Sequence, residues 1–162
     1  MSAIINKAAP DFELPATSNI KVRLSNLKGK NVVLFFYPKD NTPGCTLESQ
    51  DFRDNDKKFA ALNTVIFGIS RDDLKSHEKF KNTQSLPFEL ISDSEETLCD
   101  LYDVMKDKNM YGKKVRGIER STFLIDKNGI LRQEWRKVNV EGHVAEVLQA
   151  IKELSASYST SH

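Results

Sequence analysis

Residues 31–52, NVVLFFYPKDNTPGCTLESQDF, join a continuous apolar run to a loop with two prolines and then to a charged segment. A short apolar run rich in β-branched and aromatic residues is typical of a strand buried on both faces. The loop ends at Cys45, and the segment after it carries apolar residues at helical spacing. The stretch therefore predicts a buried strand, a loop and a helix that begins at the cysteine.

The rest of the chain alternates strand and helix patterns in the same way. Strands are predicted at 20–24, 31–38, 64–70, 88–92, 120–126 and 130–136, and helices at 45–62, 72–84, 94–104 and 142–154. This order indicates one three-layer α/β domain over residues 1–154 with a mixed sheet, because the last two strands form an antiparallel hairpin. The basic segment 106–120 is predicted to be a loop, and the aperiodic tail 155–162 is predicted to be frayed.

Composition narrows the classes of function. The chain has 24 lysines and arginines against 23 aspartates and glutamates, a net charge of +1, which argues against a nucleic-acid-binding protein. No apolar run approaches the ~20 residues that span a bilayer, and the N-terminus lacks the features of a secretory signal. We therefore expect a cytoplasmic protein without a membrane partner.

Cys45 stands where the predicted loop becomes a helix. A helix N-terminus carries partial positive charge and free N–H groups, which favour an anion such as a thiolate. Thr42 can donate a hydrogen bond to the sulfur or to an oxygen bound beside it. Pro38 and Pro43 stiffen the loop, and Gly44 lets the backbone approach a ligand. The residues alone leave two interpretations open, a reactive thiolate or a buried cysteine that packs as a small apolar side chain.

The histidines do not indicate a metal centre. His77 falls on a helix flank and His143 at a helix start, and nothing spaces them as ligands or ties them to Cys45. Both are predicted to pack, to cap a helix or to lie in solvent. The cysteine is not part of a C-x-x-C pair, and no phosphate-binding loop is present, so we expect no metal and no cofactor.

The segment YPKDNTPGCTLE contains the pattern P-x-x-x-T-x-x-C, on which the chain resembles the peroxiredoxins and, within them, the bacterioferritin-comigratory-protein (PrxQ) subfamily. Similar segments follow in the same order: APDFELP at 9–15, LSNLKGKNVVLFFYPKD at 24–40, VIFGIS at 65–70, LISD at 90–93 and GIERSTFLID at 117–126. The resemblance implies a thioredoxin-like fold with an N-terminal β extension. It also implies a thiol-dependent peroxidase that reduces hydrogen peroxide and organic hydroperoxides to water and alcohols.

The resemblance further implies roles for individual residues. Cys45 would be the peroxidatic cysteine, whose thiolate attacks the O–O bond and becomes a sulfenic acid. Thr42 would hydrogen-bond the sulfur and the peroxide, and Pro38 would shield the pocket from water. The backbone N–H groups of Gly44 and Cys45 would help to hold the peroxide. Arg120 would be the active-site arginine, whose fixed charge favours the thiolate.

The sequence leaves open how Arg120 and Glu48 are used. The alternative for Arg120 is a surface ion pair with Glu119 or Glu48. Glu48 either orients Arg120 or supports the first turn of the helix, and the residues favour neither interpretation.

The chain departs from the subfamily at its second thiol. Many members carry a resolving cysteine five residues after the first, where this chain has Gln50, and others carry it in the next helix, which here has none. The other thiol, Cys99, has apolar neighbours and is predicted to be buried and inert. The pattern favours a one-cysteine mechanism, with thioredoxin, glutaredoxin or a small thiol as reductant.

Two alternatives stay open at this point. Cys99 could resolve Cys45 in a two-cysteine mechanism after a large rearrangement, or the protein could be a peroxide sensor or thiol relay that turns over poorly. A monomer is expected, because no exposed apolar stripe is evident in the sequence.

Overall fold

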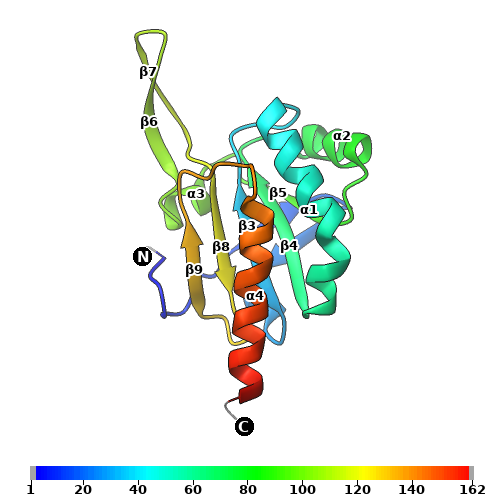
Figure 1. Ribbon diagram of the computed structural model, residues 1–162. Helices are drawn as coiled ribbons and strands as arrows, with labels where there is room; N and C mark the ends of the chain where they lie inside the picture. Colours follow the sequence, from blue (N-terminus) through cyan, green and yellow to red (C-terminus); the bar gives the residue numbers. More distant parts are fainter. Residues whose placement is uncertain (1–2, 161–162) are drawn as a thin grey trace.

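A seven-stranded sheet with the strand order β2-β1-β5-β4-β3-β8-β9 forms the centre of the structure (Figure 1). The computed structural model describes residues 3–160, without the side chains of residues 110 and 157–160. The strands are β1 (Glu13–Ala16), β2 (Ile20–Arg23), β3 (Asn31–Phe36), β4 (Thr64–Ser70), β5 (Glu89–Ser92), β8 (Ser121–Ile125) and β9 (Leu131–Trp135). The helices are η1 (Leu24–Leu27), α1 (Pro43–Ala61), α2 (Leu74–Gln84), α3 (Thr97–Leu101) and α4 (His143–Thr160). A second sheet holds β6 (Met105–Met110) and β7 (Lys113–Ile118).

The central strand β3 is buried along its whole length. It pairs in parallel with β4 and antiparallel with β8, so that Val33 lies between Ile66 and Leu124. A strand enclosed on both faces needs apolar side chains at every position, which is why its sequence is a continuous run and does not alternate. This confirms the buried strand predicted from residues 31–52, while the helix after it begins at Pro43, two residues before the predicted start at Cys45.

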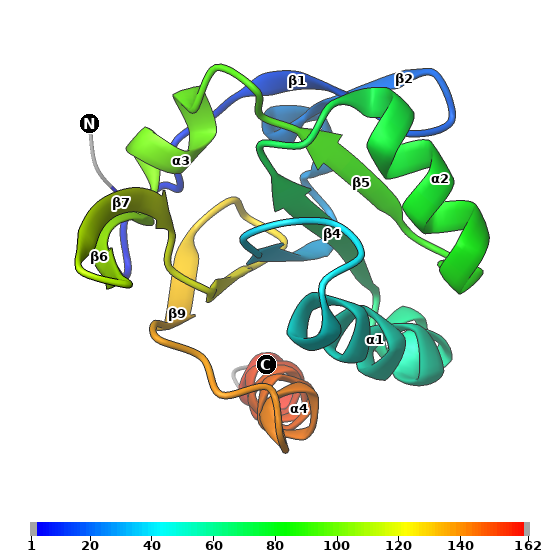
Figure 2. The same cartoon turned by 90° about the horizontal axis from the view of Figure 1, so that it is seen from above.

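Side chains that alternate along β3 belong to two separate cores. Val33 and Phe35 pack with residues of α1, α2 and α4. Val32 and Leu34 pack with the N-terminal strands, α3 and the segments around it. Figure 2 shows α1 and α4 on one side of the sheet and α3 on the other. The predicted three-layer α/β architecture with a mixed sheet is therefore confirmed.

The N-terminal segment extends the sheet at one edge. β1 and β2 form an antiparallel hairpin, and β1 joins β5 through the pair Ala16 and Ile91. This is the N-terminal β extension that the resemblance implied. None of the helices within residues 3–160 is long and apolar enough to cross a membrane.

The prediction of a loop at 106–120 was wrong. The segment forms the β6–β7 hairpin, which projects from the body of the molecule (Figure 1). Its two turn residues, Tyr111 and Gly112, have positive φ values of 53° and 79°, the backbone of a tight hairpin turn. Met105 and Ile118 pair at the buried base, but most other side chains are exposed. A hairpin that buries so little apolar surface carries a weak sequence signal.

Two helix ends also differ from the prediction. α3 covers only Thr97–Leu101, since Glu96 before it and Asp103 after it have left-handed backbones with φ values of 63° and 53°. α4 continues through Thr160 and does not end at residue 154, so the part of the predicted frayed tail within 155–160 is helical. No Gly or Pro occurs there to end a helix. The last two residues, 161–162, lie outside the described residues.

The packing around β4 generates a first test. A Cβ added at Gly68 would lie 2.8 Å from atoms of both Leu90 and Phe35, deep in the core. We expect Gly68→Ala to lower the free energy of unfolding by about 1–3 kcal/mol, the usual cost of overpacking. Gly117→Ala is the matched control, because its nearest neighbouring atom, on Arg71, is 4.0 Å away. Urea denaturation of both variants checks this, and equal stabilities would contradict it.

Candidate active site

Cys45 lies at the start of α1, directly after the loop that leaves β3. Thr42 is the N-cap with an extended backbone, and Pro43 occupies the first turn, where its missing N–H costs nothing. The amides of Gly44 and Cys45 therefore have no carbonyl partner within their own helix. β3, β4 and β5 run parallel, so this loop lies at their shared carboxyl edge, where open α/β sheets bind ligands.

Strand pairing brings Arg120 to the same edge. β8 runs antiparallel to β3, with Ser121 opposite Phe36. The residue before β8 must therefore lie beside the residue after β3. This register places Arg120 near Cys45, although the two residues are 75 positions apart in the sequence.

Arg120 joins the cysteine to a buried carboxylate. Its Nη2 donates to Sγ of Cys45 at 3.3 Å, and its Nη1 donates to Oε1 of Glu48 at 2.7 Å. Cys45 and Glu48 are fully buried, while the Arg120 side chain is 16% exposed. Burial opposes the charge of Arg120, but Glu48 and Cys45 more than offset it, so the pKa of Arg120 is raised. The guanidinium is therefore a permanent cation next to the sulfur.

Glu48 contacts Arg120 directly, as the first of the two uses left open by the sequence requires. Burial raises the pKa of Glu48 from 4.5 to about 7, although Arg120 acts in the opposite direction. Among the described residues, Oε2 of Glu48 has no hydrogen-bond donor. The carboxyl group therefore lies in an environment that penalises its charge, and only Arg120 compensates for it.

Gly44 makes room for this arrangement. A Cβ at Gly44 would lie 3.1 Å from Nη2 of Arg120, closer than side chains ordinarily pack. A glycine before the cysteine lets the guanidinium lie over the first turn of α1. The sequence predicted that Gly44 lets the backbone approach a ligand, and the group that lies there in the structure is the Arg120 guanidinium.

The structure gives Thr42 a partner other than the sulfur. Its Oγ1 donates to the carbonyl of Lys39 at 2.9 Å, which closes the loop on itself. A hydroxyl donates one hydrogen bond, so the donation to Cys45 expected from the sequence is not made here. The oxygen retains its capacity to accept a bond from a substrate. Pro38 is half-buried in the same loop.

Cys99 belongs to the other side of the sheet. It packs in the core that contains Val32 and Leu34, whereas Cys45 packs in the core that contains Val33 and Phe35. Burial and a hydrogen bond to the carboxylate of Asp93 raise the pKa of the Cys99 thiol, so it is protonated near neutral pH. The prediction that Cys99 is buried is confirmed.

His143 lies close to the site and acts in packing. It begins α4, as expected, and its Nε2 contacts Oγ1 of Thr122 at 2.7 Å. Burial, with a smaller contribution from the charge of Arg120, lowers the pKa of His143 to about 4. The ring is therefore neutral at physiological pH, and it packs edge-on against Phe52 and Trp135.

The arrangement suits a nucleophilic sulfur that reacts with a polar substrate. A thiolate is the nucleophilic form of cysteine, and a neighbouring guanidinium and a helix start both favour it. The same cation and the free amides would stabilise negative charge that develops on an oxygen near the sulfur.

Comparison with known proteins agrees with this chemistry. The AhpC/TSA family matches residues 5–134. Peroxiredoxin Bcp of Bacillus subtilis is 53% identical over 155 residues, which cover 96% of this chain and 99% of that protein. A protein of Coxiella burnetii described as a putative peroxiredoxin is 50% identical over 148 residues, 91% of this chain and 98% of the relative.

Solved structures give the same result. The bacterioferritin comigratory protein of Xanthomonas campestris superimposes with a TM-score of 0.88 and 43% identity, covering 95% of this chain and 99% of that one. The PrxQ of Xylella fastidiosa gives a TM-score of 0.90 at 38% identity, with coverages of 96% and 99%. The predicted thioredoxin-like fold is confirmed by these neighbours.

The chain therefore belongs to the AhpC/TSA family and is a peroxiredoxin, a thiol-dependent peroxidase. Within that class it belongs to the Bcp/PrxQ subfamily, as the segments around Cys45 and Arg120 indicated. Peroxiredoxin activity implies a hydroperoxide substrate and a thiol reductant.

The buried carboxyl group predicts a specific pH dependence of stability. From about pH 4.5 to about pH 7, folded Glu48 keeps a proton that the unfolded chain releases. The free energy of unfolding should therefore contain a contribution that falls, by about 3 kcal/mol in total, as pH rises through this window. Glu48→Gln should remove the contribution. Urea denaturation of both proteins at several pH values tests this, and parallel curves would contradict it.

The two contacts of the Arg120 guanidinium, one to Glu48 and one to Cys45, predict that lysine cannot replace arginine at this position. A single ammonium group cannot hold Glu48 and Cys45 through two nitrogens of one planar group. We expect Arg120→Lys to lower the rate constant of Cys45 with hydrogen peroxide by about 10²–10³-fold, as for the loss of an oxyanion donor. Competition kinetics measure the rate constant. Arg116→Lys, on the exposed face of β7, is the control and should react like the wild type.

Proposed function

We propose that this peroxiredoxin uses Cys45 as its peroxidatic cysteine and that an external thiol completes each cycle. The observation that carries the proposal is the hydrogen bond from Nη2 of Arg120 to Sγ of Cys45 at 3.3 Å, within a buried helix start. The substrates are hydrogen peroxide and organic hydroperoxides. The Xanthomonas campestris relative is described as reducing alkyl peroxides, which supports the second class for this chain.

In the first step the Cys45 thiolate attacks the terminal oxygen of the hydroperoxide. The S–O bond forms as the O–O bond breaks, and the electron pair leaves on the second oxygen. That oxygen takes a proton and departs as water or an alcohol, while Cys45 becomes a sulfenic acid. Arg120 and the amides of Gly44 and Cys45 would stabilise the negative charge as it moves. Oγ1 of Thr42 would accept a hydrogen bond from the O–H group of the peroxide. Pro38 would limit the access of water to the site.

The positions of the two thiols support a one-cysteine mechanism. A disulfide needs Cα atoms within ~7 Å, and Cys45 and Cys99 pack in cores on opposite faces of the sheet. Gln50 stands where many relatives have their second thiol, and its Nε2 donates to Oε1 of Gln84 at 2.8 Å. For Cys99 to form a disulfide with Cys45, α1 or α3 would have to unfold or move away from the sheet.

The cycle then needs two external thiols. The first condenses with the sulfenic acid, which releases water and leaves a mixed disulfide on Cys45. The second attacks the outer sulfur of that disulfide, so that Cys45 returns as a thiol and the two reductant sulfurs are left joined. Thioredoxin, glutaredoxin or a small thiol would serve. We propose that the protein acts as a monomer in the cytoplasm, where such thiols are kept reduced.

Intact mass after one equivalent of peroxide tests the proposal. We expect the wild type and Cys99→Ser each to gain one oxygen atom and Cys45→Ser to gain none. Loss of two hydrogens in the wild-type monomer, absent from Cys99→Ser, would instead establish the two-cysteine mechanism.

Turnover separates the enzyme from a sensor. Sustained peroxide consumption with thioredoxin, glutaredoxin or glutathione is expected for the wild type and for Cys99→Ser. A single turnover with every reductant would favour a peroxide sensor or thiol relay. Because no second thiol traps the sulfenic acid, excess peroxide should add further oxygens to Cys45, and the mass spectrum would show them.

A further inference from the structure

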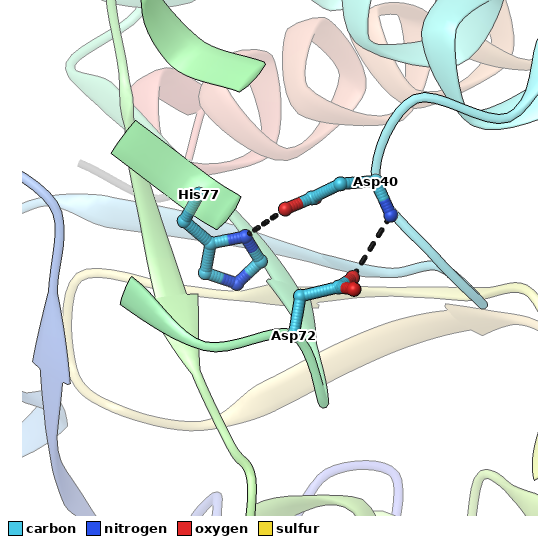
Figure 3. A group of neighbouring side chains, drawn as sticks. All are labelled: Asp40, Asp72 and His77. Carbon is cyan, nitrogen blue, oxygen red and sulfur yellow. Dashed lines mark hydrogen bonds and ion pairs between the residues drawn. The ribbon is translucent and has the colours of Figure 1, made fainter. Parts of the chain in front are cut away.

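A buried polar cluster lies beneath the loop that leads to Cys45. It contains Asp40 of the loop, Asp72 after β4 and His77 of α2 (Figure 3). Nδ1 of His77 is 2.7 Å from Oδ2 of Asp40, and both side chains are almost completely buried. The amide of Asp40 donates to Oδ2 of Asp72 at 2.8 Å. The cluster therefore holds the loop to α2 and to the end of β4.

Hydrogen bonds already use both carboxylate oxygens of Asp40 and one of Asp72, atoms that a metal ion would need. Oδ1 of Asp40 accepts from the Tyr37 hydroxyl, and Oδ2 accepts from Ser76 as well as contacting His77. Oδ2 of Asp72 accepts from the amide of Asp40 and from Ser70. A cation would have to break this network, so the geometry favours an internal ion pair over a metal site.

Both ring nitrogens of His77 lie next to hydrogen-bond acceptors. Nδ1 faces the Asp40 carboxylate, and Nε2 is 3.0 Å from the carbonyl oxygen of Ile91. Both of these oxygens are acceptors. A neutral imidazole has only one N–H, so one nitrogen would then face an acceptor without a proton between them. The Tyr37 hydroxyl, 3.5 Å from Nδ1, cannot supply that proton because it donates to Asp40.

We propose that His77 is held as a buried imidazolium and positions the active-site loop through its ion pair with Asp40. The groups around the ion pair offer acceptors to the imidazolium and donors to the carboxylate. Asp40 provides the counter-charge, the carbonyl of Ile91 accepts the second N–H, and the hydroxyls of Tyr37 and Ser76 donate to the carboxylate. His77 is a positioning residue, since the contacts described for it reach neither Cys45 nor Arg120.

The route from Asp40 to Cys45 is short. Asn41, the next residue, turns the chain through a left-handed backbone with φ 63°, a conformation that asparagine adopts more readily than most residues. Thr42 follows as the N-cap of α1. If the ion pair is lost, Asp40 keeps only its hydrogen bonds to Tyr37, Ser76 and Asp72, and the helix start that presents Cys45 to the substrate is held less firmly.

The protonation state can be tested on the wild type without any measurement of activity. In ¹⁵N-labelled protein at pH 7.5, the two ring nitrogens of His77 should both show the shifts of protonated nitrogen. His143 is the internal control, because burial keeps its pKa at about 4 and its ring should show one protonated and one bare nitrogen. His77→Gln assigns the signals. A bare nitrogen on His77, or a shift of its signals on addition of zinc, would overturn the proposal.

The positioning role rests on the peroxidase function and has a separate test. We expect His77→Gln and Asp40→Asn each to slow the reaction of Cys45 with peroxide by about tenfold or more, since small displacements at a reacting group are costly. The double variant removes both charges and should recover part of the loss. Rates are compared where circular dichroism shows folded protein. Folded single variants that react at the wild-type rate would overturn the positioning role.

Discussion

The arginine bridge between Glu48 and Cys45 is the interaction on which the site depends. Two groups that become anions, a carboxyl and a thiol, lie at zero exposure on the first turns of α1. Burying such groups is costly unless a cation accompanies them, and Arg120 contacts both through different nitrogens of one rigid plane. The glycine before the cysteine, the free amides of the helix start and the antiparallel register of β8 are all consistent with that one contact.

The central sheet separates the chemistry of the two cysteines. Alternation along β3 divides the interior into two cores, and Cys45 and Cys99 belong to different ones. On one side, Cys45 has a cation and a helix start. On the other, burial and a hydrogen bond to the carboxylate of Asp93 favour the protonated form of Cys99. The two thiols therefore differ in the charged group that contacts them, a guanidinium at Cys45 and a carboxylate at Cys99.

Local patterns predicted most of the fold. The apolar runs at β3 and β4 and the stripe of α4 each carry their signal within a few residues, and these elements form as expected. The failures have equally local reasons. The β6–β7 hairpin buries little, so its strands lack the apolar pattern. Glu96 delays the start of the expected helix through a left-handed backbone that its residue type does not predict. Thr42 is where expected, but its hydroxyl bonds to Lys39 and not to the sulfur.

The sequence by itself determined that a cysteine follows a buried strand and opens a helix, and that no second thiol stands near it in the chain. Both are properties of neighbouring residues, which the backbone keeps together in any fold. Only the tertiary structure decided which partners the cysteine has. Arg120 reaches Sγ from 75 positions away, and His77 meets Asp40 across 37 positions. Such contacts depend on strand order, register and burial, which are set by the packing of the whole chain.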